Sequence, residues 1–181
     1  MVNFIRAASL LALVPFISAA PTTADALEVR AETELFSFEK WAEDIMANPG
    51  GNHLSPDEAV ALAFNQTSND EHTIQKRASC NIVAGSPASA ADAVWCIDFI
   101  AARANVKCEA AVSGTSFCRR GLAQITGVSG GFNPPRSTST LCGNVARSAG
   151  AIMDQCTRNG QVYGTTAAWG NGNLAVHIRH P

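Results

Sequence analysis

Apolar residues recur along the second half of the chain at spacings that predict two amphipathic helices. The clearer stripe lies within residues 141–157 and follows steps of three, four, three and four through Cys142, Val145, Ala149, Ile152 and Cys156. Such steps place side chains on one helical face, so both cysteines are expected to point inward toward a sheet. A second helix is predicted over residues 89–104, where Ser89 and Asp92 have the spacing of a capping box.

Strands are predicted around these helices. Residues 174–179 alternate between apolar and polar side chains, which is the pattern of a half-buried strand. Runs at 80–84, 106–112 and 117–128 predict three more strands, the last with a bend at Gly121. The order strand, helix, strand, strand, helix, strand indicates an α+β fold of the split βαββαβ type, with an antiparallel sheet and both helices on one face.

Two shorter helices are predicted upstream of the first cysteine. The first begins with Ser37 as its cap and places on one face Phe38, Trp41 and Ile45. The second begins at Ser55-Pro56-Asp57-Glu58, which combines a cap, a proline in the first turn and an acidic residue three positions after the cap.

The first 20 residues have the features of a secretory signal peptide. Arg6 supplies the positive charge, residues 7–17 form the apolar core, and Ser18-Ala19-Ala20 provides small residues for cleavage. The apolar core is too short to span a bilayer, and no later apolar run approaches the necessary length. We therefore expect a soluble extracellular protein that folds in an oxidising compartment.

The dibasic pair Lys76-Arg77 divides the remaining chain into two segments of opposite charge. Residues 21–77, called the leader segment below, carry eleven Asp and Glu against four Lys and Arg. Residues 78–181, called the carboxy-terminal domain, carry eight Lys and Arg against four Asp and Glu. This split predicts that the pair is a processing site and that an acidic propeptide shields a basic product. Alternatively, the pair is an ordinary linker and both segments merely have solvated polar faces.

A single sequon for N-linked glycosylation begins at Asn65 and continues through Gln66 and Thr67. Because the sequon lies in the leader segment, cleavage after Arg77 would remove any glycan from the product.

The cysteines all lie in the carboxy-terminal domain, at Cys80, Cys96, Cys108, Cys118, Cys142 and Cys156. Six cysteines in a secreted protein predict three disulfides, and the sequence leaves all fifteen pairings open. A metal site is not expected, because the domain has no Cys-x-x-Cys and its two histidines, His177 and His180, stand at the end of the chain. No cofactor motif is present, so we expect no cofactor.

Catalysis is not expected from this sequence. The carboxy-terminal domain has four carboxylates, at Asp92, Asp98, Glu109 and Asp154, and no two are placed to work as an acid–base pair. Asp154 instead stands four residues before Arg158, the spacing of a helical ion pair.

A weak nuclease or hydrolase is a minor alternative, with His177, Arg179 and Glu109 as the candidate residues. The arginines are scattered rather than clustered, so no nucleic acid is expected as a partner.

Two segments are candidate contact surfaces. One is the loop at 130–139, which contains Arg136, and the other spans 163–173, with Tyr163 at its start and Trp169 near its centre. Trp169 among glycines and asparagines is suited to stack on a glycan or a protein partner, although a tryptophan that covers one end of the core would look the same.

Residues 80–181 resemble the small cysteine-rich secreted proteins of filamentous fungi, including necrosis-inducing extracellular effectors and killer-toxin-like proteins. The matching motifs are Ala90-Ala91-Asp92-Ala93-Val94-Trp95-Cys96, Phe117-Cys118, Cys142-Gly143-Asn144-Val145-Ala146-Arg147, Asp154-Gln155-Cys156-Thr157 and the closing residues 172–178. The leader segment looks like the pro-segments of fungal secreted proteins over residues 38–60. The resemblance implies an α/β sandwich with disulfides between its elements, and a non-enzymatic action on other cells.

These observations favour a monomeric, secreted effector or toxin-like protein that binds a protein, glycan or membrane-surface target outside the cell. The alternative is a wall- or glycan-binding protein that uses Trp169 and Tyr163. Fold transfers between proteins more readily than function does, so the target stays open at this point.

Overall fold

The structure is a computed structural model and describes residues 35–66, 77–80 and 85–181. These residues belong to one compact unit that spans residues 34–181. The predicted signal peptide, Lys76 and most of the predicted strand at 80–84 lie outside the described residues. None of the helices in the described part of the chain is both long and apolar enough to cross a membrane.

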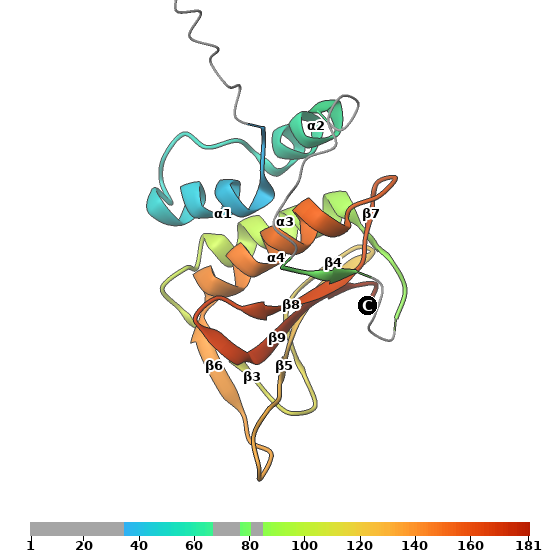
Figure 1. Ribbon diagram of the computed structural model, residues 1–181. Helices are drawn as coiled ribbons and strands as arrows, with labels where there is room; N and C mark the ends of the chain where they lie inside the picture. The colour runs from blue at the N-terminus through green and yellow to red at the C-terminus, as the bar shows by residue number, and fades with distance from the viewer. Residues whose placement is uncertain (1–34, 67–76, 81–84) are drawn as a thin grey trace, which may run out of the picture. The chain divides into compact units, whose positions relative to one another are not determined.

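An antiparallel sheet of five strands forms the base of the molecule (Figure 1). Its order is β1 (Ser79–Cys80), β8 (Gly164–Ala168), β9 (Asn171–Arg179), β5 (Ala123–Ser129) and β4 (Thr115–Arg120). Two short antiparallel ribbons accompany it, and they pair β2 (Ala88–Ser89) with β7 (Gln161–Val162) and β3 (Lys107–Ala110) with β6 (Thr138–Leu141).

The two predicted helices, α3 (Ala90–Ala101) and α4 (Cys142–Cys156), pack on one face of this sheet (Figure 1). On β9 the apolar side chains of Leu174, Val176 and Ile178 are fully buried, as the alternating pattern predicts. The predicted α+β class, with an antiparallel sheet and disulfide staples, is therefore confirmed.

The prediction of one bent strand at 117–128 is wrong, because the chain reverses at Gly121 to form β4 and β5. Gly121 has a φ of +46°, and a Cβ at this position would lie 2.4 Å from the Asp92 carboxylate. That carboxylate accepts a hydrogen bond of 2.9 Å from the amide of Leu122. The turn thus requires a residue without a side chain.

Strand β8 was not predicted, because its sequence Gly-Thr-Thr-Ala-Ala lacks large apolar residues. It forms because β9 offers it a complete hydrogen-bonding edge. The first residue of β8 is a glycine because a Cβ at Gly164 would lie 2.9 Å from both Cys156 and Ile152 on α4, too close for a side chain. Strands of this kind are stabilised by their neighbours rather than by their own propensity.

Helices α1 (Phe38–Ala47) and α2 (Pro56–Gln66) confirm the two predicted in the leader segment. Figure 1 shows α1 on the outer side of α3 and α4, away from the sheet, and it contacts both helices. Its predicted apolar face is buried in the same core as the helices and sheet, through Phe38, Trp41, Ala42 and Ile45. The indole Nε1 of Trp41 donates to the carbonyl of Leu54 at 2.9 Å, which ties α1 to the segment that leads into α2.

Three disulfides select one of the fifteen possible pairings. They join Cys80 to Cys156, Cys96 to Cys118 and Cys108 to Cys142. Each links a helix to a strand: α4 to β1, α3 to β4 and α4 to β3. Each stabilises the fold by about 2–4 kcal/mol in the usual case. Three disulfides are consistent with an extracellular protein.

Candidate binding surface around Trp169

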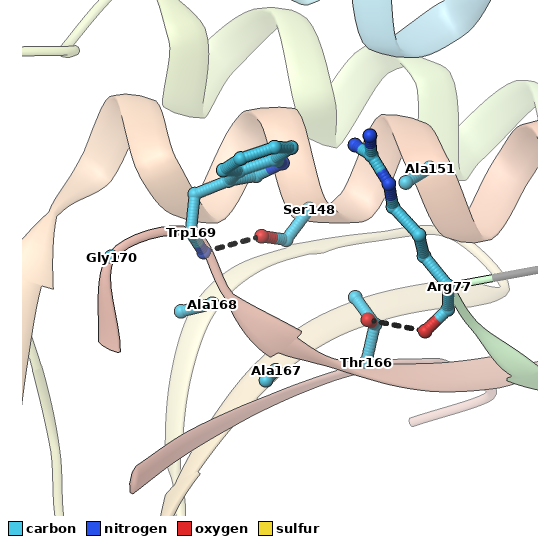
Figure 2. A pocket seen from close by; sticks show the side chains of 8 residues that line it. All are labelled: Arg77, Ser148, Ala151, Thr166, Ala167, Ala168, Trp169 and Gly170. Atoms are coloured by element: carbon cyan, nitrogen blue, oxygen red, sulfur yellow. Dashed lines mark hydrogen bonds between the residues drawn. The ribbon is translucent and has the colours of Figure 1, made fainter. Parts of the chain in front are cut away.

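Trp169 stands where β8 ends, and its indole lies beside α4 (Figure 2). Its backbone amide donates to the hydroxyl of Ser148 at 3.0 Å, and that hydroxyl donates to the carbonyl of Asn144 at 2.8 Å. The next residue, Gly170, has a φ of +67° and carries the chain into β9. The position of the half-buried indole is therefore fixed by the backbone around it.

Two guanidinium groups lie over the Trp169 ring. Arg147, on α4, is 3.6 Å from the ring centroid, and Arg77, just before β1, is 4.7 Å from it. Both distances are within the range of a cation–π interaction. The Trp169 ring, which the sequence suggested for stacking on a ligand, is thus covered by two arginine side chains.

Helix α1 brings two carboxylates to these arginines. Glu39 Oε1 accepts from Arg147 Nε at 3.0 Å and from an Arg77 Nη at 3.1 Å. Glu43 Oε1 lies 2.7 Å from the same Arg147 Nε. The acidic leader segment therefore places two carboxylates on one arginine of the carboxy-terminal domain.

A small cavity of about 210 Å³ opens beside the indole (Figure 2). Its lining comes from Arg77, from Ser148 and Ala151 on α4, and from residues 166–170. Small-molecule sites usually measure about 300–1,000 Å³. This cavity is therefore suited to receive a single side chain or sugar ring rather than a whole ligand.

The carboxylate of Asp154 on α4 caps the amino-terminal end of α1. It accepts from the Ser37 hydroxyl at 2.7 Å and from the amides of Phe38 and Glu39 at 2.7 and 3.1 Å. These bonds satisfy amides that have no partner within their own helix. Burial raises the pKa of Asp154 above its usual range, although the three hydrogen bonds act in the opposite direction. The predicted partner, Arg158, instead donates to the carbonyl of Thr157 at 2.6 Å.

Two glycines on α4 allow α1 to approach closely. A Cβ at Gly150 would lie 2.6 Å from the Cα of Glu39, and a Cβ at Gly143 would lie 2.6 Å from the sulfur of Met46. The two positions are seven residues apart, which is about two helical turns. Together with Asp154, these two glycines form the part of α4 against which α1 packs, called the glycine-lined groove below.

The peptide bond between Arg77 and Ala78, where processing is predicted, is hydrogen-bonded on both sides. The amides of Arg77 and Ala78 donate to Gln155 Oε1 at 2.9 and 2.8 Å. The Arg77 carbonyl accepts from the Thr166 hydroxyl at 2.9 Å, as Figure 2 shows. Ala78 is only 3% exposed, so this bond is part of the folded structure.

The other predicted contact residues do not share the surface around Trp169. Tyr163 is 7% exposed, and its hydroxyl lies beside Gly85 and near Arg179. Burial leaves this ring little area for a ligand. Arg136, in the loop between β5 and β6, has its guanidinium 4.4 Å from the Phe132 ring centroid. Asn65, the glycosylation candidate, is exposed in the last turn of α2.

The candidate nuclease residues are only partly brought together. His177 and Arg179 line one cavity with polar residues of β4 and β5, and Glu109 is not part of that lining. Glu109 instead pairs with Lys107 at 3.2 Å and accepts from Ser137 at 3.2 Å. Within the described residues, no cluster of three His, Cys, Asp or Glu side chains is placed to hold a metal ion.

The sequence did not single out Glu39, Arg147 or Asp154 as members of one surface. Each is an ordinary helical residue by spacing, and Glu39 is more than 100 positions from the other two. The one signal available was the charge split between the two segments, together with Glu39 and Glu43 at a spacing of four residues on the predicted helix.

A family model described as a domain of unknown function (DUF8794) matches residues 75–180 of the chain. No curated protein and no solved structure matches it.

Proposed function

The chain belongs to the DUF8794 family, and we propose that it is a secreted, cysteine-rich effector or toxin-like protein that acts by binding rather than by catalysis. The observation that carries this proposal is the surface of α4 around Trp169. There the leader segment neutralises Arg147 with Glu39 and Glu43 and fills the glycine-lined groove. A surface that the precursor covers so specifically is a candidate for the binding surface of the processed product.

Secretion and processing are part of this proposal. The predicted signal peptide and the three disulfides support export to an oxidising compartment. The family match begins at residue 75, so only three of its residues precede the proposed cut after Arg77. All six cysteines lie after that cut, so cleavage leaves the leader segment with no covalent bond to the product.

The contacts of the leader indicate what kind of target the surface takes. Arg77 leaves with the leader, whereas Arg147, Trp169 and Asp154 stay in the product. Their present ligands are two carboxylates one helical turn apart and the free amides at the start of a helix. The target we propose is therefore an extracellular protein that presents an acidic amphipathic helix.

The alternative of glycan binding through Trp169 has less support. Sugar rings stack on a bare aromatic face, and here guanidinium groups lie 3.6 and 4.7 Å from the ring centroid. Arg147 would remain there after processing. If the Trp169→Ala variant loses binding to chitin or glucan while Arg147→Gln keeps it, the glycan alternative replaces the one proposed here.

The test compares cleaved and uncleavable forms of the secreted protein. The wild-type chain is co-expressed with a dibasic-specific protease of the secretory route, so that cleavage can precede the docking of β1. A variant with Lys76→Ala and Arg77→Ala serves as the matched control. Both are applied to plant leaf tissue and to other fungi, and both are used to capture extracellular proteins. We expect activity and capture from the cleaved protein alone, and their loss in the cleaved Arg147→Glu variant. Equal activity of the cleaved and uncleavable forms would contradict the proposed role of the leader.

A further inference from the structure

The face of the sheet that points away from the helices carries a second cavity, of about 320 Å³. It lies over strands β4, β5 and β9, and its polar lining includes Ser116, Gln124, Thr126, His177 and Arg179. On β9, His177 and Arg179 alternate with Val176 and Ile178, which are buried on the helix side. The cavity is therefore on the opposite face of the sheet from the helices.

The strand register places the polar side chains in two adjacent rows. His177 on β9 pairs with Thr126 on β5, which pairs with Ser116 on β4. Arg179 pairs with Gln124, which pairs with Arg119. Directly paired side chains in such rows lie about 4.5–5.5 Å apart at Cβ, so neighbouring members of a row can contact one ligand.

The chemistry of this lining is that of hydrogen-bond donors. It has hydroxyls, an amide, an imidazole and a guanidinium, and no carboxylate is among its residues. Arg119, at the end of the second row, adds a further positive charge. Donors and positive charge without a neighbouring carboxylate attract anions.

Buried nitrogens at this site have no partner within the described residues. Arg179 Nε and His177 Nδ1 are buried without a hydrogen bond, and so is the hydroxyl of Tyr163. Tyr163 and Arg179 both lie within 3.6 Å of the Cβ position of Gly85, so these two side chains are neighbours. Buried polar atoms are nearly always paired in folded proteins. Burial and the charge of Arg179 both lower the pKa of His177, and an anion is the ligand that would balance that charge.

We propose that this cavity binds a small ligand through an oxyanion group, with Arg179 and His177 as donors and the hydroxyls of Thr126 and Ser116 completing the contact. A phosphate, a sulfate and a sugar carboxylate share this chemistry. The volume is near the lower limit of about 300 Å³ for small-molecule sites, which fits a monosaccharide acid or phosphate. Among the described residues, no carboxylate lines the cavity, and the role that we propose for the site is binding.

The experiment is a titration of the full secreted chain with inorganic phosphate, sulfate and galacturonate, each at constant ionic strength. Binding is followed by calorimetry and by the NMR signal of the Arg179 Nε–H. We expect one of the three anions to bind saturably and to shift that signal. The anion that binds identifies the source of the oxyanion group.

Three variants make the test specific. Arg179→Gln removes the main donor and is expected to weaken binding by about tenfold or more, the loss typical of a charged hydrogen bond. Thr126→Val keeps the side-chain shape, removes one hydroxyl and is expected to weaken binding by a smaller factor. Arg136→Gln makes the same charge change on the loop beside Phe132, and it is expected to leave binding unchanged. Thermal melts identify any variant that fails to fold.

The inference is overturned if none of the anions binds saturably at millimolar concentration. It is also overturned if Arg179→Gln and Arg136→Gln reduce the affinity equally, because the effect would then come from overall charge. Neither result bears on the surface around Trp169, which lies beside α4 on the other side of the sheet.

Discussion

The two faces of the central sheet differ in how their polar groups are satisfied. On the helix side, the carboxylates of α1 meet Arg147, and Asp154 meets the free amides of α1. On the open face, Arg179 and His177 keep buried nitrogens without a partner among the described residues. The polar groups of the first surface are paired within the chain, whereas the second surface leaves donors for the anion that we propose. The two faces therefore differ in whether their buried polar groups have partners within the chain.

The substitution expected to destabilise the helix side most is Trp41→Ala. Trp41 is 3% exposed and is part of the common core, so its truncation is expected to lower the free energy of unfolding by about 3–5 kcal/mol. Denaturant titration of the full chain measures the change. The matched control is Leu62→Ala on α2, where the side chain is 39% exposed and the expected change is below about 0.5 kcal/mol. Equal effects would show that α1 does not contribute to the core.

Gly150→Ala tests the close approach of α1 to α4. Alanine in place of glycine stabilises an isolated helix by about 1 kcal/mol. Here the new Cβ would meet the Glu39 backbone at 2.6 Å, and overpacking of this kind costs about 1–3 kcal/mol. We therefore expect a net loss of stability in thermal unfolding. Gly172→Ala, where no atom lies within 4 Å of the new Cβ, is the control and is expected to be neutral. A stabilised Gly150→Ala would contradict the groove.

Asp154→Ala removes the carboxylate cap of α1 from a different helix. Loss of a cap residue typically costs about 0.5–2 kcal/mol, and three donors lose their acceptor here. Hydrogen exchange at the amides of Phe38 and Glu39 should accelerate more than exchange in α3. Uniform acceleration throughout the domain would instead indicate a general loss of stability.

The pH dependence of stability offers a separate test of Asp154. Its folded-state pKa is raised above the usual value of 3.8, so the folded protein binds a proton at a higher pH than the unfolded chain does. The contribution of Asp154 to stability should therefore increase as the pH falls through the folded-state pKa, and it should level off below about pH 3.8. In denaturant titrations, the free energy of unfolding of the wild type should therefore rise relative to that of Asp154→Asn as the pH is lowered. Parallel curves would show that Asp154 titrates normally.

The smallest expected effect is that of Glu43→Gln, which removes one of the two carboxylates on Arg147. Glu43 and Arg147 have side chains that are 37% and 33% exposed, so the pair should contribute only about 0.2–1 kcal/mol. The change should still be visible in the Trp169 fluorescence, because Arg147 lies over the ring. Asp44→Asn makes the same charge change at an exposed neighbouring position and should leave the fluorescence unchanged.

The fold could be predicted wherever the spacing of neighbouring residues alone determines which side chains are buried or which residue caps a helix. The stripe on α4, the alternation on β9 and the caps at Ser37 and Ser89 are of this kind, and each is present in the structure. Strand β8 could not be predicted, because its neighbours rather than its own residues stabilise it. The disulfide pairing could not be chosen either, since inward-facing cysteines on a helix can reach several strands.

The candidate site was harder to predict than the fold. Trp169 was identified as a contact residue, but its surroundings come from α1, α4 and the residues before β1, which are far apart in the sequence. No pattern in the sequence indicates that Asp154 faces the end of another helix rather than Arg158. Contacts between residues far apart in the sequence depend on how the elements pack. A spacing rule for residues within one helix does not predict them.

The hydrogen bonds around Arg77 and Ala78 bear on the proposed cleavage between these two residues. A protease takes its substrate as an extended, unpaired segment, but this peptide bond is bonded to Gln155 and Thr166 and continues directly into β1. If the chain is secreted and processed as we propose, cleavage after Arg77 competes with the docking of β1 and formation of the Cys80 disulfide. If the protease acts first, the chain folds in two pieces; once β1 has docked, the precursor is expected to resist cleavage. The ratio of the two secreted forms would then record the relative rates of folding and transport.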